Sequence, residues 1–488
     1  MTTPSRSASA RRPRRVVVIG GGLTGMLTAA VLAERCDEVV IAERDVLPTT
    51  PAPRRGLPQA PHAHVLWSGG ARAIDNILPG IIDEWIAAGA RRIPLPGGLV
   101  SMTPQGWFRR WPTELQFLIS CSRDLLDWCI RKRVLAHPAV RVREQVTVTA
   151  LLGSAARVTG VRLHDRSPHA GSTEGAESTG RVEDLAADLV VDAGGRGTRA
   201  VSWLADLGVT GIQEAEVDSG VAYATRIYAA PAGTENYPLV NVQPRANTGR
   251  PGRGTIIAPI EGGRWLVTLS GTRGGEPTKD PAAFEAFARS VRHPIVGELI
   301  THTTPLSDEI LVTRSTLNRR RFYERNALPD GFIALGDAVA TYNPVYGHGM
   351  SVAALSALAL RTELRRHGLH SPGLARRVQR EVATPTDMAW QMATGQDILY
   401  PGATGTQPKA LDRVAQKYID RLTLTATARP YATRALLDVM TLSAPATTLF
   451  RPTVVLTALR GPRRSALAQP PLTVAERSLV ASPPVEVP

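Results

Sequence analysis

Cysteine is scarce in this sequence, and its three residues, Cys36, Cys121 and Cys129, are widely spaced. Such a small number excludes a disulfide framework or a Cys-rich zinc site, and it favours a reducing compartment. No apolar run approaches the length of about 20 residues that a membrane-spanning helix needs, and the run at 454–459 is far shorter. We therefore expect a cytoplasmic protein without a membrane partner.

Lysine is also scarce, because it accounts for only four of the 57 basic residues. The formal charge of +14 and the pI near 10.3 would suit a protein that binds nucleic acid or an anionic membrane surface. However, the arginines are spread along the chain and no nucleic-acid-binding motif accompanies them. A non-enzymatic basic protein therefore remains only an alternative, and we expect no nucleic-acid partner.

The basic N-terminus followed by "VVVIGGGLTGMLTAAVLA" has the outline of a secretory signal, but its glycines indicate a strand, a tight turn and a helix instead. Gly20, Gly22 and Gly25 have the spacing of a dinucleotide fingerprint, in which the glycines permit the turn and let a pyrophosphate approach the backbone. A second strand, "EVVIAERD", ends at Glu43, where a carboxylate can bind ribose hydroxyls. The fingerprint predicts a bound dinucleotide and leaves FAD and NAD open.

Two further strands end in glycine turns. The strand at 188–192 is followed by Gly194 and Gly195, and the strand at 332–335 is followed by Gly336 and Asp337. Three such turns from distant parts of the chain predict one composite site, which a single NAD would not need.

The motifs "CSRDLLDW" and "GD", the latter followed by "NPVYGHGMS", resemble those of FAD-dependent monooxygenases of the aromatic-hydroxylase class. The resemblance implies an α/β fold with a Rossmann-like FAD-binding domain (GR2, aromatic-hydroxylase type), an antiparallel β-sheet substrate domain and a C-terminal helical region. It also implies a set of cofactor-binding residues: Gly20, Gly22, Gly25, Glu43, Arg44, Arg55, Gln59, Arg123, Asp337, Pro344, Gly347, Gly349 and Met350. Among these, Asp337 would bind the ribityl chain, and the loop from Pro344 would face the pyrimidine end of the flavin, where a helix dipole stabilises negative charge.

A narrower resemblance covers nearly the whole chain. The stretches "RRGLPQAPHAHVLWSGGARAIDNILPG", "QGWFRRWP", "GVAYATRIY", "PIEGGRWLVTLSGTRG" and "YNPVYGHGMS" are similar to the flavin epoxidases of bacterial polyether ionophore biosynthesis. The resemblance implies FAD as cofactor, O2 as co-substrate, and epoxidation of a linear polyene polyketide, free or carrier-bound, through a flavin C4a-hydroperoxide. Because an alkene needs no base to remove a proton, we expect a pocket of defined shape rather than an essential catalytic side chain.

The histidines of "GLPQAPHAHVLW" raise the question of a metal, since His62 and His64 could face the same way in an extended chain. No third ligand follows at zinc-like spacing, so we predict no metal. The resemblance places this segment near the flavin, and we favour hydrogen bonding by Gln59, His62 and His64 over proton handling. His348 is the other catalytic candidate, although packing within its loop is at least as plausible.

The substrate pocket is expected in the middle of the chain, where "GVAYATRIYAA" and "GTIIAPIEGGRWLVTLSG" alternate polar and apolar residues as antiparallel strands do. Trp67, Trp107, Trp111 and Tyr223 are the predicted pocket residues. The adjacent pair Arg109–Arg110 could bind a carboxylate or the acyl terminus of a substrate, or could be solvated surface.

Departures from the broader family leave alternatives open. Gly194–Gly195 stands where many aromatic hydroxylases have Asp-Gly, so electrons could come from NAD(P)H directly or through a separate flavin reductase. The Trp-x-Trp-x-Ile-Pro motif of flavin halogenases is absent, which disfavours halogenation. An aromatic or polyketide hydroxylase is the second hypothesis, and a flavoprotein similar to geranylgeranyl reductases is the third.

The composition along the chain also predicts domain boundaries, with a loop or hairpin insertion at 165–184. We expect a flexible basic tail at 1–14 and a discontinuous FAD-binding domain at 15–215 and 310–375, interrupted by substrate-domain segments near 90–115. A β-sheet substrate domain at 216–309 and a C-terminal helical region at 376–465 are expected beside it. The last segment, 466–488, is a Pro-rich tail, and we expect disorder from Pro470.

Overall fold

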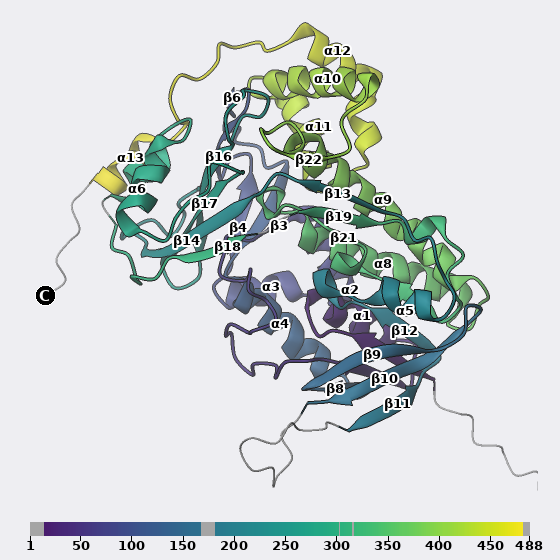
Figure 1. Ribbon diagram of the computed structural model, residues 1–488. Coiled ribbons are helices and arrows are strands. Elements are labelled where there is room, and N and C mark those ends of the chain that lie inside the picture. The colour runs from purple at the N-terminus through teal and green to yellow at the C-terminus, as the bar shows by residue number, and fades with distance from the viewer. Residues whose placement is uncertain (1–13, 167–180, 302, 315–316, 482–488) are drawn as a thin grey trace, which may run out of the picture.

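The computed structural model describes residues 14–166, 181–301, 303–314 and 317–481 (Figure 1). The predicted tail at 1–14 therefore lies almost entirely outside the described residues, as does most of the predicted insertion. In the described part of the chain, no helix is both long and apolar enough to cross a bilayer.

A five-stranded parallel sheet forms the first layer, with strand order β20-β12-β1-β2-β8. Its strands are β1 (Arg15–Ile19), β2 (Glu38–Ala42), β8 (Val140–Arg143), β12 (Leu189–Asp192) and β20 (Phe332–Ala334). Because all five run in parallel, the three predicted glycine turns emerge at the same edge of the sheet. Segments more than 300 residues apart in sequence thus meet at one site.

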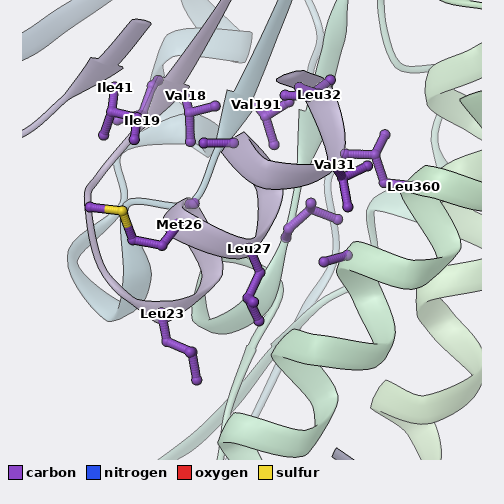
Figure 2. Close-up of a cluster of buried hydrophobic side chains, with 14 of the residues drawn as sticks. Val18, Ile19, Leu23, Met26, Leu27, Val31, Leu32, Ile41, Val191 and Leu360 are labelled. Atoms are coloured by element: carbon purple, nitrogen blue, oxygen red, sulfur yellow. The ribbon is translucent and has the colours of Figure 1, made fainter. Parts of the chain in front are cut away.

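Helix α1 (Leu23–Ala33) is buried between this sheet and helix α8 (Gly349–His367) (Figure 2). Leu27 and Leu32 are fully buried and belong to one apolar cluster with Val18, Val191 and Leu360. Two helices, α2 (Ser68–Ile77) and α4 (Arg123–Leu135), pack beside α1 and α8, whereas α3 (Ile81–Ala87) packs against α4. The packing fixes where α1 begins, and therefore where the glycine turn lies.

Two small antiparallel sheets adjoin this core. The first, with order β11-β10-β9, consists of β9 (Val146–Gly153), β10 (Val158–Asp165) and β11 (Val182–Ala186), beside helix α5 (Ala200–Asp206). The predicted insertion joins β10 to β11, and its central residues 167–180 lie outside the described residues. The second sheet consists of β3 (Val65–Trp67), β4 (Arg91–Leu95) and β7 (Gln116–Ser120).

A mixed seven-stranded sheet forms the middle of the molecule, with order β18-β14-β17-β16-β15-β5-β6. Its strands are β5 (Leu99–Thr103), β6 (Gly106–Trp107), β14 (Ala222–Ala229), β15 (Leu239–Val242), β16 (Arg253–Ile260), β17 (Arg264–Gly271) and β18 (Leu311–Arg314). One face packs on α6 (Pro281–Ser290) and α7 (Ile295–Ile300) around Trp265 and Phe284. Strand β5 pairs in parallel with β15, so this sheet is not purely antiparallel as the alternation predicts.

The C-terminal third is helical. A four-stranded sheet, made of β13 (Glu214–Asp218), β19 (Asn318–Arg321), β21 (Ala340–Thr341) and β22 (Thr404–Gly405), lies between the parallel sheet and these helices (Figure 1). The helices are α9 (Leu374–Asp397), α10 (Ala410–Ala426), α11 (Pro430–Met440), α12 (Pro452–Arg460) and α13 (Val474–Ala481).

The expectation of disorder from Pro470 is wrong for the described part of that segment. Leu472 is buried in the cluster around Phe284, and α13 follows it (Figure 1). Arg110 donates to Glu476 at 2.6 Å, and Arg109 donates to the carbonyl of Ser465. The two arginines considered as substrate ligands are therefore anchors of the C-terminal segment.

The glycine turn yields a stability prediction. A Cβ at Gly25 would lie 1.9 Å from the carbonyl oxygen of Gly20, so Gly25→Ala must displace α1 from the sheet. We expect a loss of about 1–3 kcal/mol in unfolding free energy, measured by chemical denaturation. Gly395→Ala on α9 is the control, because nothing lies within 4 Å of its Cβ and alanine favours a helix by up to about 1 kcal/mol. Equal stabilities for the two variants would contradict the proposed close contact.

Candidate active site

The turn after β1 offers a binding place for an anion. Gly20 has a φ of +93°, and a Cβ there would lie 2.7 Å from the carbonyl oxygen of Ala193. Helix α1 begins after Gly22, and no side chain caps its N-terminus. Its first N–H groups are therefore available for a phosphate, as the sequence predicts.

Glu43 lies at the end of β2 beside this turn and is almost fully buried. Its Oε2 accepts from the N–H of Gly21 at 2.6 Å and lies 3.3 Å from Nη1 of Arg54. Arg44 and Arg55, the predicted cofactor ligands, are exposed. The sequence analysis missed Arg54, because three arginines within twelve residues give no signal of which one turns inward.

Asp337 lies in the short helix at Gly336–Ala338 that follows β20. Burial raises the pKa of Asp337, and the positive charges of Arg196 and Arg123 oppose that rise. This opposition places both cations within electrostatic reach of the Asp337 carboxylate. Arg123, the first residue of α4, also donates to Asp127 at 2.7 Å.

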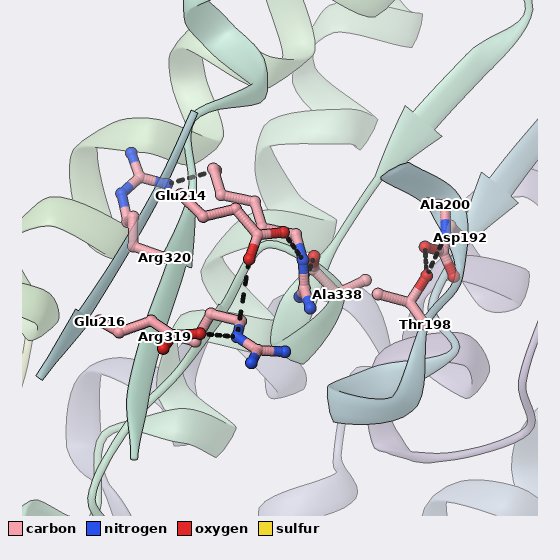
Figure 3. A network of polar contacts seen from close by, with 9 residues as sticks. Asp192, Thr198, Ala200, Glu214, Glu216, Arg319, Arg320 and Ala338 are labelled. Carbon is pink, nitrogen blue, oxygen red and sulfur yellow. Dashed lines mark hydrogen bonds and ion pairs between the residues drawn. The ribbon is translucent and has the colours of Figure 1, made fainter. Parts of the chain in front are cut away.

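A buried arginine that the sequence analysis missed holds this turn in place. Arg321 on β19 donates through Nη1 to the carbonyl oxygen of Ala338 at 3.1 Å and pairs with Glu214 at the same distance. Figure 3 labels Glu214 and Ala338, the two partners of Arg321, and shows Asp192 at the end of β12, which accepts from Thr198 at 2.5 Å. The ends of β12 and β20 are thus both fixed by charged groups.

The segment with two histidines meets the loop before α8. Trp67 donates from Nε1 to the carbonyl oxygen of Tyr346 at 3.1 Å. Gly347 has a φ of +68°, and a Cβ there would lie 2.8 Å from Cγ2 of Val65. The contact therefore requires glycine at 347, and it joins β3 to the loop predicted to face the flavin.

A buried carboxylate organises the same loop. Asp397, at the end of α9, is only 1% exposed, and it accepts from the Nδ2 groups of Asn318 and Asn343 and from the hydroxyl of Tyr346 at 2.8–3.0 Å. Tyr223 in turn donates to Oδ1 of Asn343. Nothing in the local sequence around Asp397 indicates this role, because these three donors lie 79, 54 and 51 residues away in the chain.

The three histidines of the site are uncharged at neutral pH, since burial lowers the pKa of each to about 4. Nδ1 of His62 lies 2.7 Å from the hydroxyl of Thr225, whereas Nδ1 of His64 donates to the carbonyl oxygen of His62. Nε2 of His348 donates to the carbonyl oxygen of Met440 at 3.0 Å. His62 and His64 thus have different partners, and His348 connects its loop to α11.

A cavity of about 830 Å³ lies beyond this loop. Its lining includes Gln59, Trp67 and Tyr223, as well as Pro344 and Gly347. The wall opposite the seven-stranded sheet is formed largely by apolar residues of the C-terminal helices, among them Met388, Met392, Ile419, Leu436, Leu437, Val439, Met440, Leu449 and Phe450.

Two predicted pocket residues lie elsewhere. The side chain of Trp107 is buried in the cluster on the α6 side of the sheet, and Trp111 donates to the hydroxyl of Thr433. Phe108, between them, lines the cavity. The alternation of a strand explains the difference, because neighbouring side chains face opposite sides of the sheet.

The arrangement fits FAD. The glycine turn and the uncapped α1 N-terminus would hold the pyrophosphate, Glu43 an adenosine ribose and Asp337 the ribityl chain. The loop of Pro344–Gly349 and the N-terminus of α8, which has no side-chain cap, would face the flavin ring. The cavity begins at this loop, which leaves space for a substrate beside the ring.

No family model matches the sequence. The chain is 31% identical to Protein Rv3254 of Mycobacterium tuberculosis over 393 residues, which cover 80% of this chain and 81% of that protein. The chain belongs to the same family as this mycobacterial protein. It is also 28% identical to a kynurenine 3-monooxygenase of Salinispora arenicola over 75% of both chains.

Two solved structures have the same fold. The myxobacterial chondrochloren halogenase CndH matches with a TM-score of 0.59 at 18% identity, over 89% of this chain and 99% of that one. PqsL, a probable FAD-dependent monooxygenase from Pseudomonas aeruginosa, matches with a TM-score of 0.56 at 17% identity, over 79% and 96%. These likenesses confirm the predicted fold class.

Asp397 provides a test of how the loop is held. Asp397→Asn replaces one accepting oxygen by an NH2 group, which would face the donors of Asn318, Asn343 or Tyr346. We therefore expect a loss of about 1–3 kcal/mol in unfolding free energy and weaker FAD retention after gel filtration. Glu381→Gln, an exposed charge change on the same helix, is the control. FAD retention equal to that of the control would contradict a role for Asp397 in shaping the loop.

The histidines predict a pH dependence of stability. Their folded-state pKa of about 4 lies below the usual value of about 6.5, so the unfolded chain takes up protons first as the pH falls. Stability should therefore decrease below pH 6.5, by about 1.4 kcal/mol per pH unit for each histidine. Denaturant titrations between pH 6.5 and 5 measure this slope, which His348→Gln should reduce, and a slope unchanged by His348→Gln would contradict the burial of a neutral imidazole.

Proposed function

We propose that the protein is an FAD-dependent monooxygenase that epoxidises alkenes of a linear polyene polyketide, in the manner of the polyether epoxidases it resembles. The observation that carries this proposal is the cavity of about 830 Å³, which extends from the loop of Pro344–Gly349 along an apolar wall of three helices. A long apolar chain can lie in such a cavity with one segment beside the flavin ring.

The chain's own residues would bind, orient and exclude water. FAD, when bound and reduced, would supply the oxygen-activating chemistry. The N-terminus of α8 would stabilise negative charge at the pyrimidine end of the ring. Trp67 and Tyr346 would keep the loop closed against β3, and the methionines and leucines of the helical wall would keep water from the reacting alkene.

The state of the histidines supports an alkene as substrate. Hydroxylation of a phenol usually requires a group that removes a proton, whereas an alkene reacts without one. His62, His64 and His348 all line the cavity, and a pKa near 4 makes each a weak base. Hydrogen bonding by His62 is therefore favoured over proton handling.

Hydroxylation of an aromatic or polyketide substrate is the second candidate function, and the kynurenine 3-monooxygenase relatives favour it. Gly194 stands where the broader family has an acid, and its N–H donates to Asp192 at 2.9 Å. We therefore propose a separate flavin reductase as the source of electrons, with direct reduction by NAD(P)H as the alternative.

Product analysis tests the proposed function. We expect the FAD-loaded protein, given a reducing source, O2 and a polyene with trisubstituted alkenes, to form products heavier by one oxygen per step. Mass spectrometry before and after acid opening to diols identifies epoxides. Asp337→Ala should retain less FAD and form less product, whereas Asp206→Ala, an exposed acid, should behave as the unmodified protein.

The other outcomes separate the alternatives. Oxygen gain on an aromatic ring would support the hydroxylase, and saturation of alkenes would support a reductase similar to geranylgeranyl reductases. A protein that cannot be loaded with FAD would contradict all three hypotheses.

A further inference from the structure

Although the chain is rich in arginine, the walls of the cavity contain negatively charged but no positively charged side chains among the described residues. The charged side chains that line it are the carboxylates Glu216, Asp412 and Asp420, besides three histidines that are neutral. Among the described residues, no arginine or lysine belongs to the lining. An enzyme that binds a free carboxylic acid normally offers it a cation, because burying an unpaired carboxylate is costly.

Two arginines near this region are bound to other groups. Arg292 donates to the carbonyl oxygens of Thr103, Pro104 and Gln243. Arg319 pairs with Glu216 at 2.7 Å. Neither guanidinium lines the cavity, so neither provides a ready partner for the carboxylate of a substrate.

The opening of the cavity is also acidic. Thr406, Gln407 and Asp412 are lining residues that are exposed, and they mark the solvent end. Just inside, Asp420 accepts from the side-chain amides of Gln105 and Gln416 at 3.0 and 3.1 Å. An acidic end group of a long substrate would therefore meet carboxylates at either position.

The sheet wall of the cavity contributes hydroxyl and amide groups beside apolar side chains such as Leu99 and Leu239. Strand pairing places Ser101, Asn241, Ile256 and Thr268 in one row across β5, β15, β16 and β17. These four residues all line the cavity. Neighbours of these residues along the strands, among them Val100, Val240, Val267 and Leu269, belong to the apolar cluster on the α6 and α7 side, whereas Thr255 beside Ile256 is a polar lining residue.

A second row repeats the pattern. Gly254, Ser270 and Tyr223 are paired across β16, β17 and β14, and all three line the cavity. Four buried polar atoms of lining residues lack a partner among the described residues, namely Nε2 of His62, Oδ1 of Asn241, Oγ1 of Thr255 and Nδ1 of His348. Buried acceptors of this kind are normally satisfied by a ligand or by water.

On the basis of the proposed function, we infer that the substrate enters as a neutral acyl chain, an ester or thioester rather than a free acid, that carries oxygen groups along one edge. Its oxygen groups face the polar rows of the sheet, and its alkenes and alkyl branches face the helical wall. The walls would then fix both the orientation of the chain and the edge that it presents to the flavin.

Binding is the first test, and it is measured separately from oxygenation. The probes are farnesoic acid, its methyl ester and its N-acetylcysteamine thioester, each titrated into the oxidised holoenzyme and followed by perturbation of the flavin absorbance. We expect the two neutral probes to bind roughly tenfold more tightly than the acid at pH 7.5, because the acid meets carboxylates without a cation. Tighter binding of the thioester than of the methyl ester would indicate a carrier-bound chain.

Asp420→Asn provides a charge-specific variant with the same shape. We expect it to reduce the preference for the neutral probes without changing the affinity for the methyl ester. Equal or tighter binding of the acid by the unmodified protein would overturn the inference, as would failure of all probes to bind. A preference for the neutral probes without oxygenation would keep this inference and count against the proposed function, whereas oxygenation without the preference would do the reverse.

Recognition of the substrate's oxygen groups by the sheet is tested at Asn241. A thioester of the same chain with a hydroxyl group at the β-carbon should bind more tightly than the probe without it, and Asn241→Leu should remove that advantage. Ile256→Val, an apolar change in the same row, is the control and should preserve it. An advantage that survives in Asn241→Leu would contradict recognition of oxygen groups by the sheet.

Discussion

The buried carboxylate of Asp397 is the constraint on which the geometry of the site depends. A carboxylate that is removed from water is tolerated only if donors surround it, and here the donors come from β19, from the loop before α8 and from that loop's own tyrosine. The need of Asp397 for donors holds the end of α9 against the loop that precedes α8. Since α9 begins the helical region that forms the far wall of the cavity, one buried charge fixes both the flavin side and the substrate side.

The loop is held from three directions. Asp397 binds it from α9, Trp67 from β3, and His348 from within the loop reaches α11 through the carbonyl oxygen of Met440. Each contact joins a different layer of the protein, so displacement of one layer would move the loop relative to the others. Gly347 also fixes the loop locally, because its backbone has a positive φ and lies in close contact with the side chain of Val65.

Local patterns in the sequence were enough to predict the parallel sheet and its glycine turns, because a strand, a turn and a helix are neighbours in the chain. Contacts made at long range could not be predicted in the same way. Arg54 and Arg55 are chemically identical and adjacent, and only the folded chain shows that Arg54 is the partner of Glu43. Likewise, Arg109 and Arg110 are in a segment rich in tryptophan that suggested a pocket, yet each donates a hydrogen bond to a residue among the last 25 of the chain.

The distribution of charge shows how a strongly basic chain can contain a cavity whose described lining has no cation. Its arginines are used as structural anchors, as Arg321 is at the turn of Asp337 and Arg110 is at the C-terminal segment. In each case the guanidinium is bound to a carboxylate or a carbonyl oxygen and cannot turn to another anion without leaving that partner unsatisfied. The described lining of the cavity therefore contains no cation, and its three carboxylates stand beside amides, hydroxyls and neutral imidazoles that can hydrogen-bond a neutral ligand. The same packing that stabilises the fold thus restricts the charge of what the cavity can accept.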